Sequence, residues 1–218
     1  MKPPLTGRLL RRVLRRASSP EHAGFAARVL PVLDGAVPRS PSGAEFLHSS
    51  CTDEHWAARY LAARSLPRMV PDLIGFEETW ALLLGLACDP VVAVREGVPF
   101  GLAGVVQRCP EAVAPLKRLI VDSTAASAER KAALRSLILL AVDPGTADVS
   151  EGLLRAAAHA GGWVTAGVGP VIIRRGIASR DPERATEILR EWLDSGDPVL
   201  QEQATRALRP VAAREGSS

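Results

Sequence analysis

Three side chains that can bind a metal ion stand close together in the sequence, at His48, Cys51 and His55. Zinc accepts imidazole nitrogen and thiolate sulfur, but a structural zinc site is tetrahedral and this H-x2-C-x3-H spacing supplies only three ligands. The segment also spans an expected turn between two helices, where polar residues are ordinary. The spacing therefore does not predict a metal site.

Motifs for nucleophilic catalysis and for phosphate binding do not occur in the sequence. It contains no G-x-S-x-G, no H-E-x-x-H and no glycine-rich phosphate loop. The acidic pair Glu77–Glu78 falls at an expected helix start, where the helix dipole favours carboxylates. These patterns favour a non-catalytic protein that holds no cofactor.

Arginines and tryptophans stand at fixed places in a motif that the chain repeats. Residues 53–66 read DEHWAARYLAARSL and residues 89–102 read DPVVAVREGVPFGL, so an Arg six positions after the Asp and a Leu thirteen positions after it recur. Related segments begin at residues 124, 160 and 195, and a weaker one begins at residue 17. The spacing of 35 or 36 residues predicts a repeat architecture of about six units.

Each repeat motif is expected to begin a helix. Ser-Pro at 19–20 and Asp-Pro at 89–90 and 197–198 place a capping side chain before a proline, which suits the first helical turn. A second apolar stretch with helical spacing precedes each motif, so the unit is a helical hairpin. The first helices are expected in residues 5–16, 44–49, 76–87, 111–121, 149–158 and 182–193, and the second helices near Ser19, Asp53, Pro90, Ser127, Trp163 and Pro198.

The motif resembles the HEAT-repeat family, most closely in Asp89-Pro90-Val91-Val92-Ala93-Val94-Arg95. The resemblance covers residues 42–213 in five clear repeats and residues 4–33 more weakly. It implies an all-α fold, a right-handed α-α superhelix (HEAT-like solenoid) of five to six helical hairpins, in which inner B helices line a concave surface and A helices lie outside. It also implies that the motif arginines Arg59, Arg95 and Arg130 stack one repeat on the next.

Two of the expected B helices contain a proline. Pro99 and Pro170 each remove a backbone hydrogen bond and are predicted to bend the helix axis. The second of these helices is also rich in glycine, at positions 161, 162, 167 and 169. We therefore expect a local irregularity in this part of the chain.

Six arginines and two tryptophans are candidate binding residues on the B-helix surface. The position eleven residues after the motif start lies about 120° from the core positions on a helical wheel, so its side chains should face outward or into the groove. The candidates are Arg28, Arg64, Arg135 and Arg206 at this position, Arg68 and Arg175 one turn beyond it, and Trp56 and Trp163 at the third position. A ladder of guanidinium groups suits phosphates or a carboxylate-rich partner, although an Arg-rich composition also places arginines at exposed positions.

Residues 169–210 are similar to the HEAT-like DNA glycosylases of alkylation repair. That resemblance implies a basic concave face that cradles DNA, with a carboxylate beside tryptophans. The sequence lacks the paired Trp and catalytic Asp of that family, because Trp80 is followed by Ala-Leu-Leu-Leu. DNA binding related to these glycosylases is therefore the alternative function, and no catalytic residue is assigned.

The basic charge of the chain is concentrated at its N-terminal end. Residues 1–17 carry six Lys or Arg and no acid, and subtracting these six charges from the net +3 leaves the remaining residues at −3. An Arg-rich segment of this kind can bind an anionic membrane, nucleic acid or an acidic partner, and it also suits a transit peptide. We interpret it as the outer helix of the first repeat with solvated arginines, because residues 17–30 fit the repeat motif.

Composition and cysteine content place the chain among ordinary globular proteins. Hydrophobic residues make up 47% and charged residues 23%, and the three cysteines are too few for a disulfide framework. No apolar run approaches the length of a membrane span, so we expect a soluble, cytoplasmic protein. The sequence predicts a single HEAT-like repeat domain over residues 1–218, with a basic helical pair at residues 1–33. We expect a non-catalytic scaffold whose concave face holds a protein or another anionic partner, with nucleic acid as the alternative.

Overall fold

The computed structural model describes residues 7–19, 21, 23–33 and 35–209, and this part of the chain is built from helices and turns without a strand. The expectation of an all-α fold is confirmed. The described chain forms two compact units, Met1–Ala112 with Ala126–Ala132, and Val113–Ala125 with Ala133–Ser218. Each unit is described separately below.

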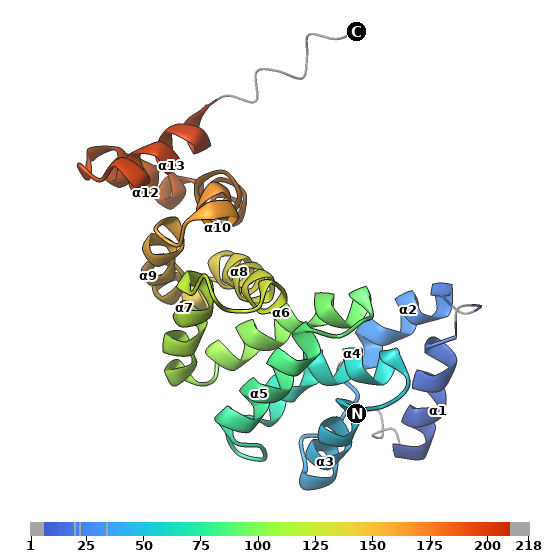
Figure 1. Ribbon diagram of the computed structural model, residues 1–218. Coiled ribbons are helices and arrows are strands. Elements are labelled where there is room, and N and C mark those ends of the chain that lie inside the picture. Colours follow the sequence, from blue (N-terminus) through green and yellow to red (C-terminus); the bar gives the residue numbers. More distant parts are fainter. Residues whose placement is uncertain (1–6, 20, 22, 34, 210–218) are drawn as a thin grey trace, which may run out of the picture. The chain divides into compact units, whose positions relative to one another are not determined.

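The first unit contains three helical hairpins (Figure 1). α1 contacts α2, α3 contacts α4, and α5 contacts α6, while α4 also lies against α1, α2 and α6. The helices span Gly7–Ala17 (α1), Ala23–Leu33 (α2), Pro41–Ser50 (α3), Trp56–Ser65 (α4), Phe76–Ala87 (α5) and Val92–Val106 (α6), with short 3-10 turns at Leu66–Met69 (η2) and Pro110–Ala112 (η3). The expected helices therefore occur in this unit, with ends that shift by a few residues.

Glycines let α4 and α6 approach each other closely. A Cβ atom added at Gly101 of α6 would lie 2.3 Å from the carbonyl oxygen of Ala63 in α4 and 2.6 Å from Cδ2 of Leu83. One turn earlier, a Cβ atom at Gly97 would lie 3.3 Å from Tyr60. Because a real Cβ atom does not fit at 2.3 Å, Gly101 permits this contact between two B helices.

Pro99 lies within α6, which continues as an α-helix from Val92 to Val106. Proline removes one backbone hydrogen-bond donor from a helix, and the α-helix nevertheless continues on both sides of Pro99. The side chain of Pro99 is buried in the first unit. The proline is therefore part of the packed surface of this helix.

The second unit holds the remaining helical segments. They span Val113–Val121 (α7), most of Ser127–Val142 (α8), Pro144–Thr146 (η4), Ala147–Ala158 (α9), Gly162–Gly167 (α10), Val168–Ile177 (η5), Ala178–Arg180 (α11), Pro182–Asp194 (α12) and Pro198–Leu208 (α13). The first residues of α8 belong to the first unit. α9 contacts α7 and α10, and α12 contacts α13.

The irregularity expected around Pro170 is a π-helix. η5 covers the ten residues Val168–Ile177 and continues directly from α10 into α11. A Cβ atom at Gly169 would lie 2.3 Å from the carbonyl oxygen of Gln203 in α13, and the Gly169 N–H donates to Gln203 Oε1 at 3.3 Å. α13 therefore comes closest to η5 at Gly169, within the segment whose π-helical turns are wider than those of an α-helix.

Aspartates at the motif starts bind backbone N–H groups two residues later. Asp53 accepts from the N–H of His55, Asp89 from that of Val91, and Asp197 from that of Val199. Asp197 caps α13, with Pro198 in the first turn as predicted. The predicted start of α6 at Pro90 is two residues early, because Val91 is extended and precedes the helix. Pro20, in the predicted Ser-Pro start, lies outside the described residues.

The motif arginines join loops in the same way in successive repeats. Arg59 Nη1 donates to the carbonyl oxygens of Asp53 and Glu54, at 2.7 and 3.1 Å. Thirty-six residues later, Arg95 Nη1 donates to the carbonyl oxygens of Asp89 and Pro90, at 2.5 and 2.9 Å. Arg59 also binds the Asp89 carboxylate through Nε at 2.6 Å and Nη2 at 3.1 Å, so it links one repeat to the next.

Candidate functional site

Three arginines of the first unit line one cavity of about 330 Å³, which we call the arginine cavity. Its lining residues are Gly35, Arg64, Pro67, Arg68, Phe100, Gly104, Gln107 and Arg108. They come from the segment after α2, the end of α4 with η2, and the end of α6. The cavity therefore lies among the segment after α2, the end of α4 with η2, and the second half of α6.

The position of these arginines follows from local helix chemistry. Arg64 lies in the last turn of α4, Arg68 lies in η2, and Arg108 follows the end of α6. A cation near a helix C-terminus is favoured by the partial negative charge of the last carbonyl groups. The same preference thus collects three guanidinium groups at one place.

Arg64 is oriented by aromatic side chains. Its Cζ atom lies 4.1 Å from the ring centroid of Phe100 and 6.0 Å from that of Tyr60. Arg64 and Phe100 occupy the same motif position in successive repeats, so the stacking of two repeats brings them together. The contact holds the guanidinium group against one wall of the cavity while its N–H groups stay at the edge of the plane.

The lining of the arginine cavity suits an anion. Among the described residues that line it there are three guanidinium groups, one amide and no carboxylate. Guanidinium groups bind carboxylates and phosphates through paired, charge-assisted hydrogen bonds. Pro67, Phe100 and Gly104 provide an apolar wall beside them. The cavity can therefore accept an acidic group together with the aliphatic carbons that carry it.

Sequence reasoning found two of the three arginines. Arg64 and Arg68 were candidates, whereas Arg108 lies outside the repeated positions and was not predicted. Arg108 could have been found from its position just after the end of the helix that became α6. Phe100 stands at the eleventh position of the next motif, and its contact with Arg64 depends on the packing of α6 against α4.

The other arginine candidates lie at separate places. Arg28 is exposed on α2 in the first unit, and it does not line the arginine cavity. Arg135, Arg175 and Arg206 are exposed in the second unit, on α8, η5 and α13. Arg206 binds Glu202 at 2.5 Å one helical turn away, which neutralises part of its charge. Arg28, Arg135 and Arg206, which stand at the eleventh motif position, are therefore exposed side chains.

The two tryptophan candidates differ in their surroundings. Trp56 is partly buried, and its indole Nε1 donates to the carbonyl oxygen of Ser18 at 3.1 Å, which ties the start of α4 to the end of α1. Trp163 lies in α10 of the second unit and is 45% exposed. Trp80 and Trp192 are buried in the core. Among the four tryptophans, Trp163 therefore presents the largest exposed ring.

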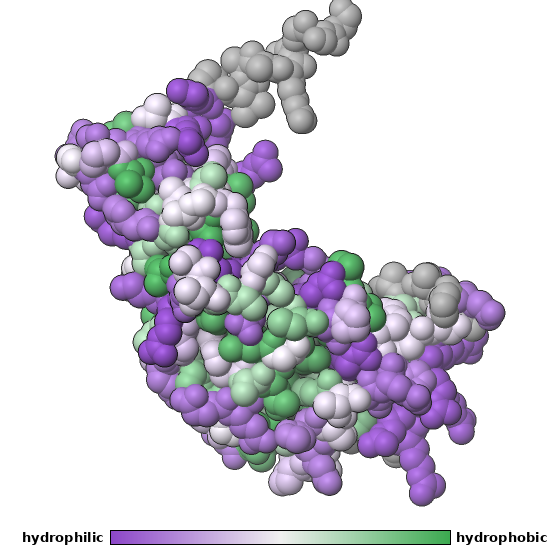
Figure 2. All heavy atoms as spheres, viewed as in Figure 1, coloured by the Kyte–Doolittle hydropathy of each residue, from purple (hydrophilic) through white to green (hydrophobic). Residues whose placement is uncertain are grey.

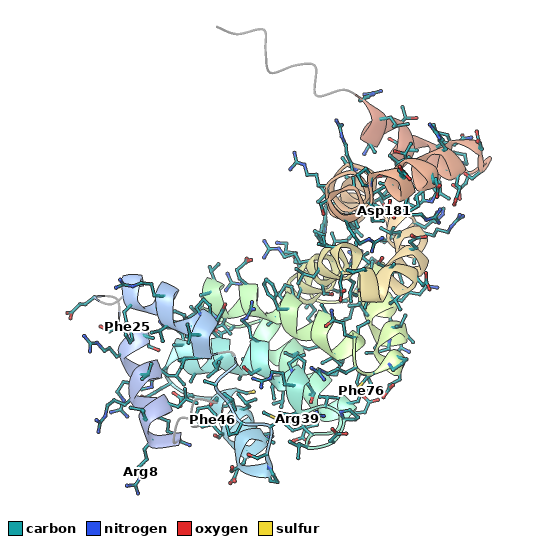
Figure 3. The ribbon with its side chains drawn as sticks, turned by 180° about the vertical axis from the view of Figure 1, so that it is seen from behind. Arg8, Phe25, Arg39, Phe46, Phe76 and Asp181 are labelled. Carbon is teal, nitrogen blue, oxygen red and sulfur yellow. The ribbon has the colours of Figure 1, made fainter. Side chains whose placement is uncertain are left out.

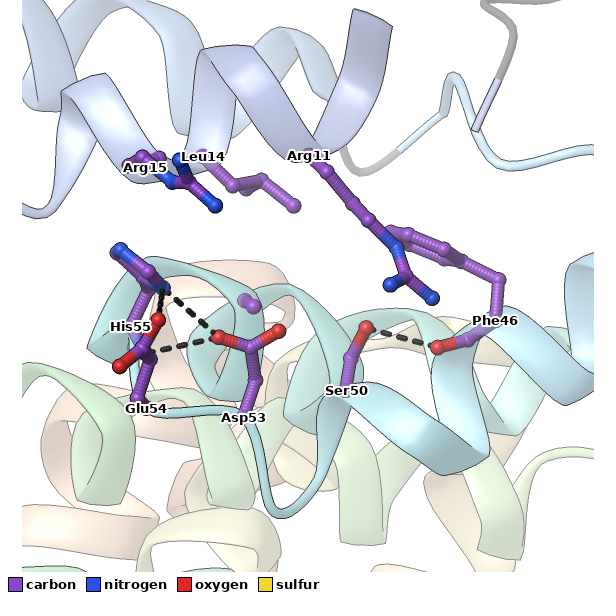
Figure 4. Close-up of a pocket in the computed structure, with 9 residues that line it drawn as sticks. Arg11, Leu14, Arg15, Phe46, Ser50, Asp53, Glu54 and His55 are labelled. Carbon is purple, nitrogen blue, oxygen red and sulfur yellow. Dashed lines mark hydrogen bonds and ion pairs between the residues drawn. The ribbon is translucent and has the colours of Figure 1, made fainter. Parts of the chain in front are cut away.

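Of the three residues considered for a metal site, His55 lines a second cavity, of about 220 Å³ (Figure 4). His55 Nδ1 lies 3.0 Å from Asp53 Oδ1 and 3.5 Å from Glu54 Oε1, while Arg11 and Arg15 of α1 form the opposite wall. His48 instead lies 3.1 Å from Glu78 through its Nε2 atom. The two histidines therefore have different carboxylate partners.

Cys51 is separated from both histidines by its bonding and burial. Its Sγ donates to the carbonyl oxygen of Leu47 at 3.4 Å, and burial raises the pKa of the thiol to about 12. A protonated thiol is a poor metal ligand and a poor nucleophile. Within the described residues, no group of three or more His, Cys, Asp or Glu side chains is arranged to hold a metal ion.

No helix in the described ranges is both long and apolar enough to cross a membrane. Of the two cavities described above, the arginine cavity is the one lined by three guanidinium groups. Comparison of the chain with protein-family models, with curated proteins and with solved structures finds no match.

Proposed function

We propose that this chain is a HEAT-like α-solenoid, a right-handed superhelix whose hairpins stack in sequence order as one repeat domain. The repeated hydrogen bonds of Arg59 and Arg95 support this proposal, because they join equivalent loop atoms at a spacing of 36 residues. The bond from Arg59 to Asp89 supports stacking between neighbouring repeats. Solenoids of this kind expose long surfaces that bind other molecules.

The proposed function is non-catalytic binding of an acidic protein segment by the B-helix surface of the first unit. The observation that carries this proposal is the arginine cavity, in which Arg64, Arg68 and Arg108 gather beside the apolar side chains of Pro67 and Phe100. An aspartate or glutamate side chain pairs with a guanidinium group through two parallel hydrogen bonds. The apolar wall beside the arginines suits the carbon atoms of such a side chain.

Base excision in DNA, the alternative function, receives less support. A glycosylase stacks the extruded base against aromatic side chains. Trp80 and Trp192 are buried, and Trp56 donates its indole N–H to Ser18. Trp163 is exposed but does not line the arginine cavity. Acidic protein is therefore our first choice, and nucleic acid at the same cavity is an outcome that the following experiment distinguishes.

A peptide titration tests the proposal. The probe is a short fluorescein-labelled peptide of alternating Glu and Ser, titrated with the full chain at low salt and followed by fluorescence anisotropy. We expect saturable binding that weakens by roughly 10-fold to 100-fold in the Arg64→Gln/Arg68→Gln/Arg108→Gln variant, because each of the three solvent-accessible ion pairs contributes up to about 1 kcal/mol. The Phe100→Ala variant should show a smaller loss, because it removes only the surface that orients Arg64.

Two controls make the result specific to the cavity. The variant Arg118→Gln/Arg190→Gln removes two exposed arginines from other helices and should bind the peptide as the unaltered chain does. A peptide of alternating Lys and Ser should not bind. Peptide binding that survives loss of the three cavity arginines contradicts the proposal. Duplex DNA that binds in place of the peptide, and is lost with these arginines, favours the alternative function.

A further inference from the structure

α1 has an arginine-rich outer face that the proposed function does not use. Leu10, Leu14 and Ala17 are buried against the rest of the first unit, where α1 contacts α2 and α4. The other side of the helix carries the exposed side chains of Arg8, Leu9, Arg11, Arg12, Arg15 and Arg16. Figure 2 shows a continuous hydrophilic surface over this helix, and Figure 3 shows Arg8 pointing away from the body of the unit.

The charge at the start of α1 and the spacing of its arginines oppose the stability of this helix, although Arg15 and Arg16 lie in its last turn, where the helix dipole favours cations. Arg8 lies in the first turn, where the helix dipole disfavours a positive charge. Arg8, Arg12 and Arg16 are four residues apart, and like charges at that spacing destabilise a helix by about 0.2–0.5 kcal/mol per pair. α1 contains no acidic residue that would relieve this repulsion. An anion bound along the helix would relieve it.

The arginines divide into two sets by their surroundings. Arg11 and Arg15 line the cavity that also contains Asp53 and Glu54, so carboxylates face them within the molecule. Arg8 and Arg12 are exposed and belong to neither described cavity. With a rise of 1.5 Å per residue, their backbone positions are about 6 Å apart along the helix. The outer row thus presents regularly spaced charge without a pocket.

A membrane surface is a poor partner for this face. Helices that lie in a membrane interface bury a broad apolar side in the lipid. The apolar side of α1 is buried against the rest of the first unit. Leu9, which is 44% exposed, is the large apolar side chain that this helix leaves on its surface. A pocket for a single carboxylate is equally lacking here, since the described cavities are lined by other residues. The exposed arginines of α1 therefore fit a partner that carries anionic groups at regular intervals.

We propose that the outer face of α1 binds the phosphate backbone of double-stranded nucleic acid without reading its base sequence. Arginine side chains on a convex helix contact phosphates and release counterions, and this term does not depend on the bases. The interaction is independent of the arginine cavity, so it adds a second anionic partner to the proposed function. Arg8 and Arg12 supply the phosphate contacts. Neither side chain lines the cavity that contains Asp53 and Glu54, so those carboxylates do not compete with the phosphates.

The salt dependence of DNA affinity provides the test. Duplex DNA of two unrelated sequences is titrated with the full chain between about 50 and 200 mM salt, and the logarithm of the affinity is plotted against that of the salt concentration. We expect equal affinity for both sequences. The Arg8→Gln/Arg12→Gln variant should lower the slope by about 1.8, because each lost phosphate contact lowers it by about 0.9. The Arg8→Lys/Arg12→Lys variant keeps both charges and should keep the slope.

Three further measurements decide between this proposal and its competitors. The glutamine variant keeps Leu10 and Leu14, so its helical circular dichroism and its melting temperature should equal or exceed those of the unaltered chain. The Arg64→Gln/Arg68→Gln/Arg108→Gln variant should bind DNA normally, which separates this inference from the acidic-peptide proposal. An unchanged slope in Arg8→Gln/Arg12→Gln overturns the inference. So does binding to phosphatidylserine vesicles that depends on Arg8 and Arg12 when DNA binding does not.

Discussion

Arg59 joins two repeats through contacts that a longer or shorter side chain would not reproduce. Its guanidinium group donates to two carbonyl oxygens of its own loop and to both oxygens of Asp89. The side chains of Arg59 and Asp89 are 14% and 6% exposed, so water screens this pair little. Desolvation raises the pKa of Asp89, but hydrogen bonds from Arg59 and from the Val91 N–H, with the charges of Arg59 and Arg95, outweigh it and leave the pKa below its ordinary value.

Replacing Asp89 by Asn is expected to destabilise the fold in a pH-dependent way. The loss at pH 7 should be about 1.5–3 kcal/mol, the range for hydrogen bonds to charged groups. Because folding lowers the pKa of Asp89, its carboxylate stabilises the folded state fully above about pH 5, and this contribution disappears as the pH falls from about 4 through the lower folded pKa. Urea unfolding measured at several pH values from 7 to 3 should therefore show that the difference in unfolding free energy between Asp89→Asn and the unaltered chain becomes smaller as the pH falls.

The exposed ion pair between Arg39 and Asp72 provides the matched control. Surface pairs contribute little, so Asp72→Asn should change the free energy of unfolding by less than about 0.5 kcal/mol at any of these pH values. A constant difference for Asp89→Asn across the whole pH range would show that the charge of Asp89 is not what stabilises the fold.

The three cysteines should differ sharply in reactivity. Cys88 is exposed, whereas Cys51 and Cys109 are buried and burial raises the pKa of each thiol. Because the thiolate is the reactive form, a disulfide reagent such as DTNB at pH 8 should modify one thiol quickly in the folded chain. The fast phase should vanish in Cys88→Ser, and all thiols should react in denaturant. A second fast thiol in the folded chain would contradict the burial of Cys51 and Cys109.

At the scale of elements, the glycine face of α6 determines how closely two B helices pack. Alanine normally stabilises a helix interior relative to glycine by about 1 kcal/mol. At Gly101 a Cβ atom would lie 2.3 Å from the backbone of α4, so the added methyl group must push the helices apart. The packing of α4 on α6 therefore reverses the usual preference at this position.

The Gly101→Ala variant should lower the free energy of unfolding by about 1–3 kcal/mol, as expected for overpacking. The control is Gly85→Ala in α5, where no atom lies within 4 Å of the added Cβ and alanine should be neutral or stabilising. Thermal melting followed by circular dichroism measures both. Equal effects of the two substitutions would mean that helix propensity, and not packing, decides the outcome at Gly101.

Helix positions could be predicted from the sequence because their signals are local. Asp and Pro at the motif starts, and apolar residues at helical spacing, depend only on neighbouring residues. The form of η5 depends on Gly169 meeting the backbone of Gln203, which is 34 residues away. Pro170 and the nearby glycines therefore indicated an irregular helix, but nothing local indicated wide π-helical turns.

At the scale of the whole molecule, the candidate site could be predicted only in part. The repeat register placed Arg64 and Arg68 on an outward face, and both line the arginine cavity. Arg108 joins them through the stacking of successive helices, which no single repeat specifies. The candidates Arg135, Arg175, Arg206 and Trp163 belong to the second unit.

The packing of α1 makes it a structural part of the first unit. Leu14 is buried, and Ser18 at the end of this helix accepts the N–H of Ala57 through its side chain at 3.1 Å. Leu14→Ala should therefore cost about 2–5 kcal/mol of unfolding free energy, measured by urea titration. Val32→Ala on the exposed side of α2 should have little effect. If Leu14→Ala proved neutral, α1 would not be part of the cooperative fold, and removing residues 1–17 would be a clean way to remove their charge.

The hydrogen bonds of Arg59 also limit how the chain can change in length during evolution. An insertion of one residue within α5 would turn everything after it by about 100° around the helix axis, which would move Asp89 away from Arg59. Duplication of a complete unit of 36 residues would instead place a new arginine and a new aspartate in the same relation. Arg95 already repeats the bonds of Arg59 to the carbonyl oxygens of its own loop. Homologous chains should therefore differ by whole repeats, with smaller insertions confined to the loops that Arg59 does not join.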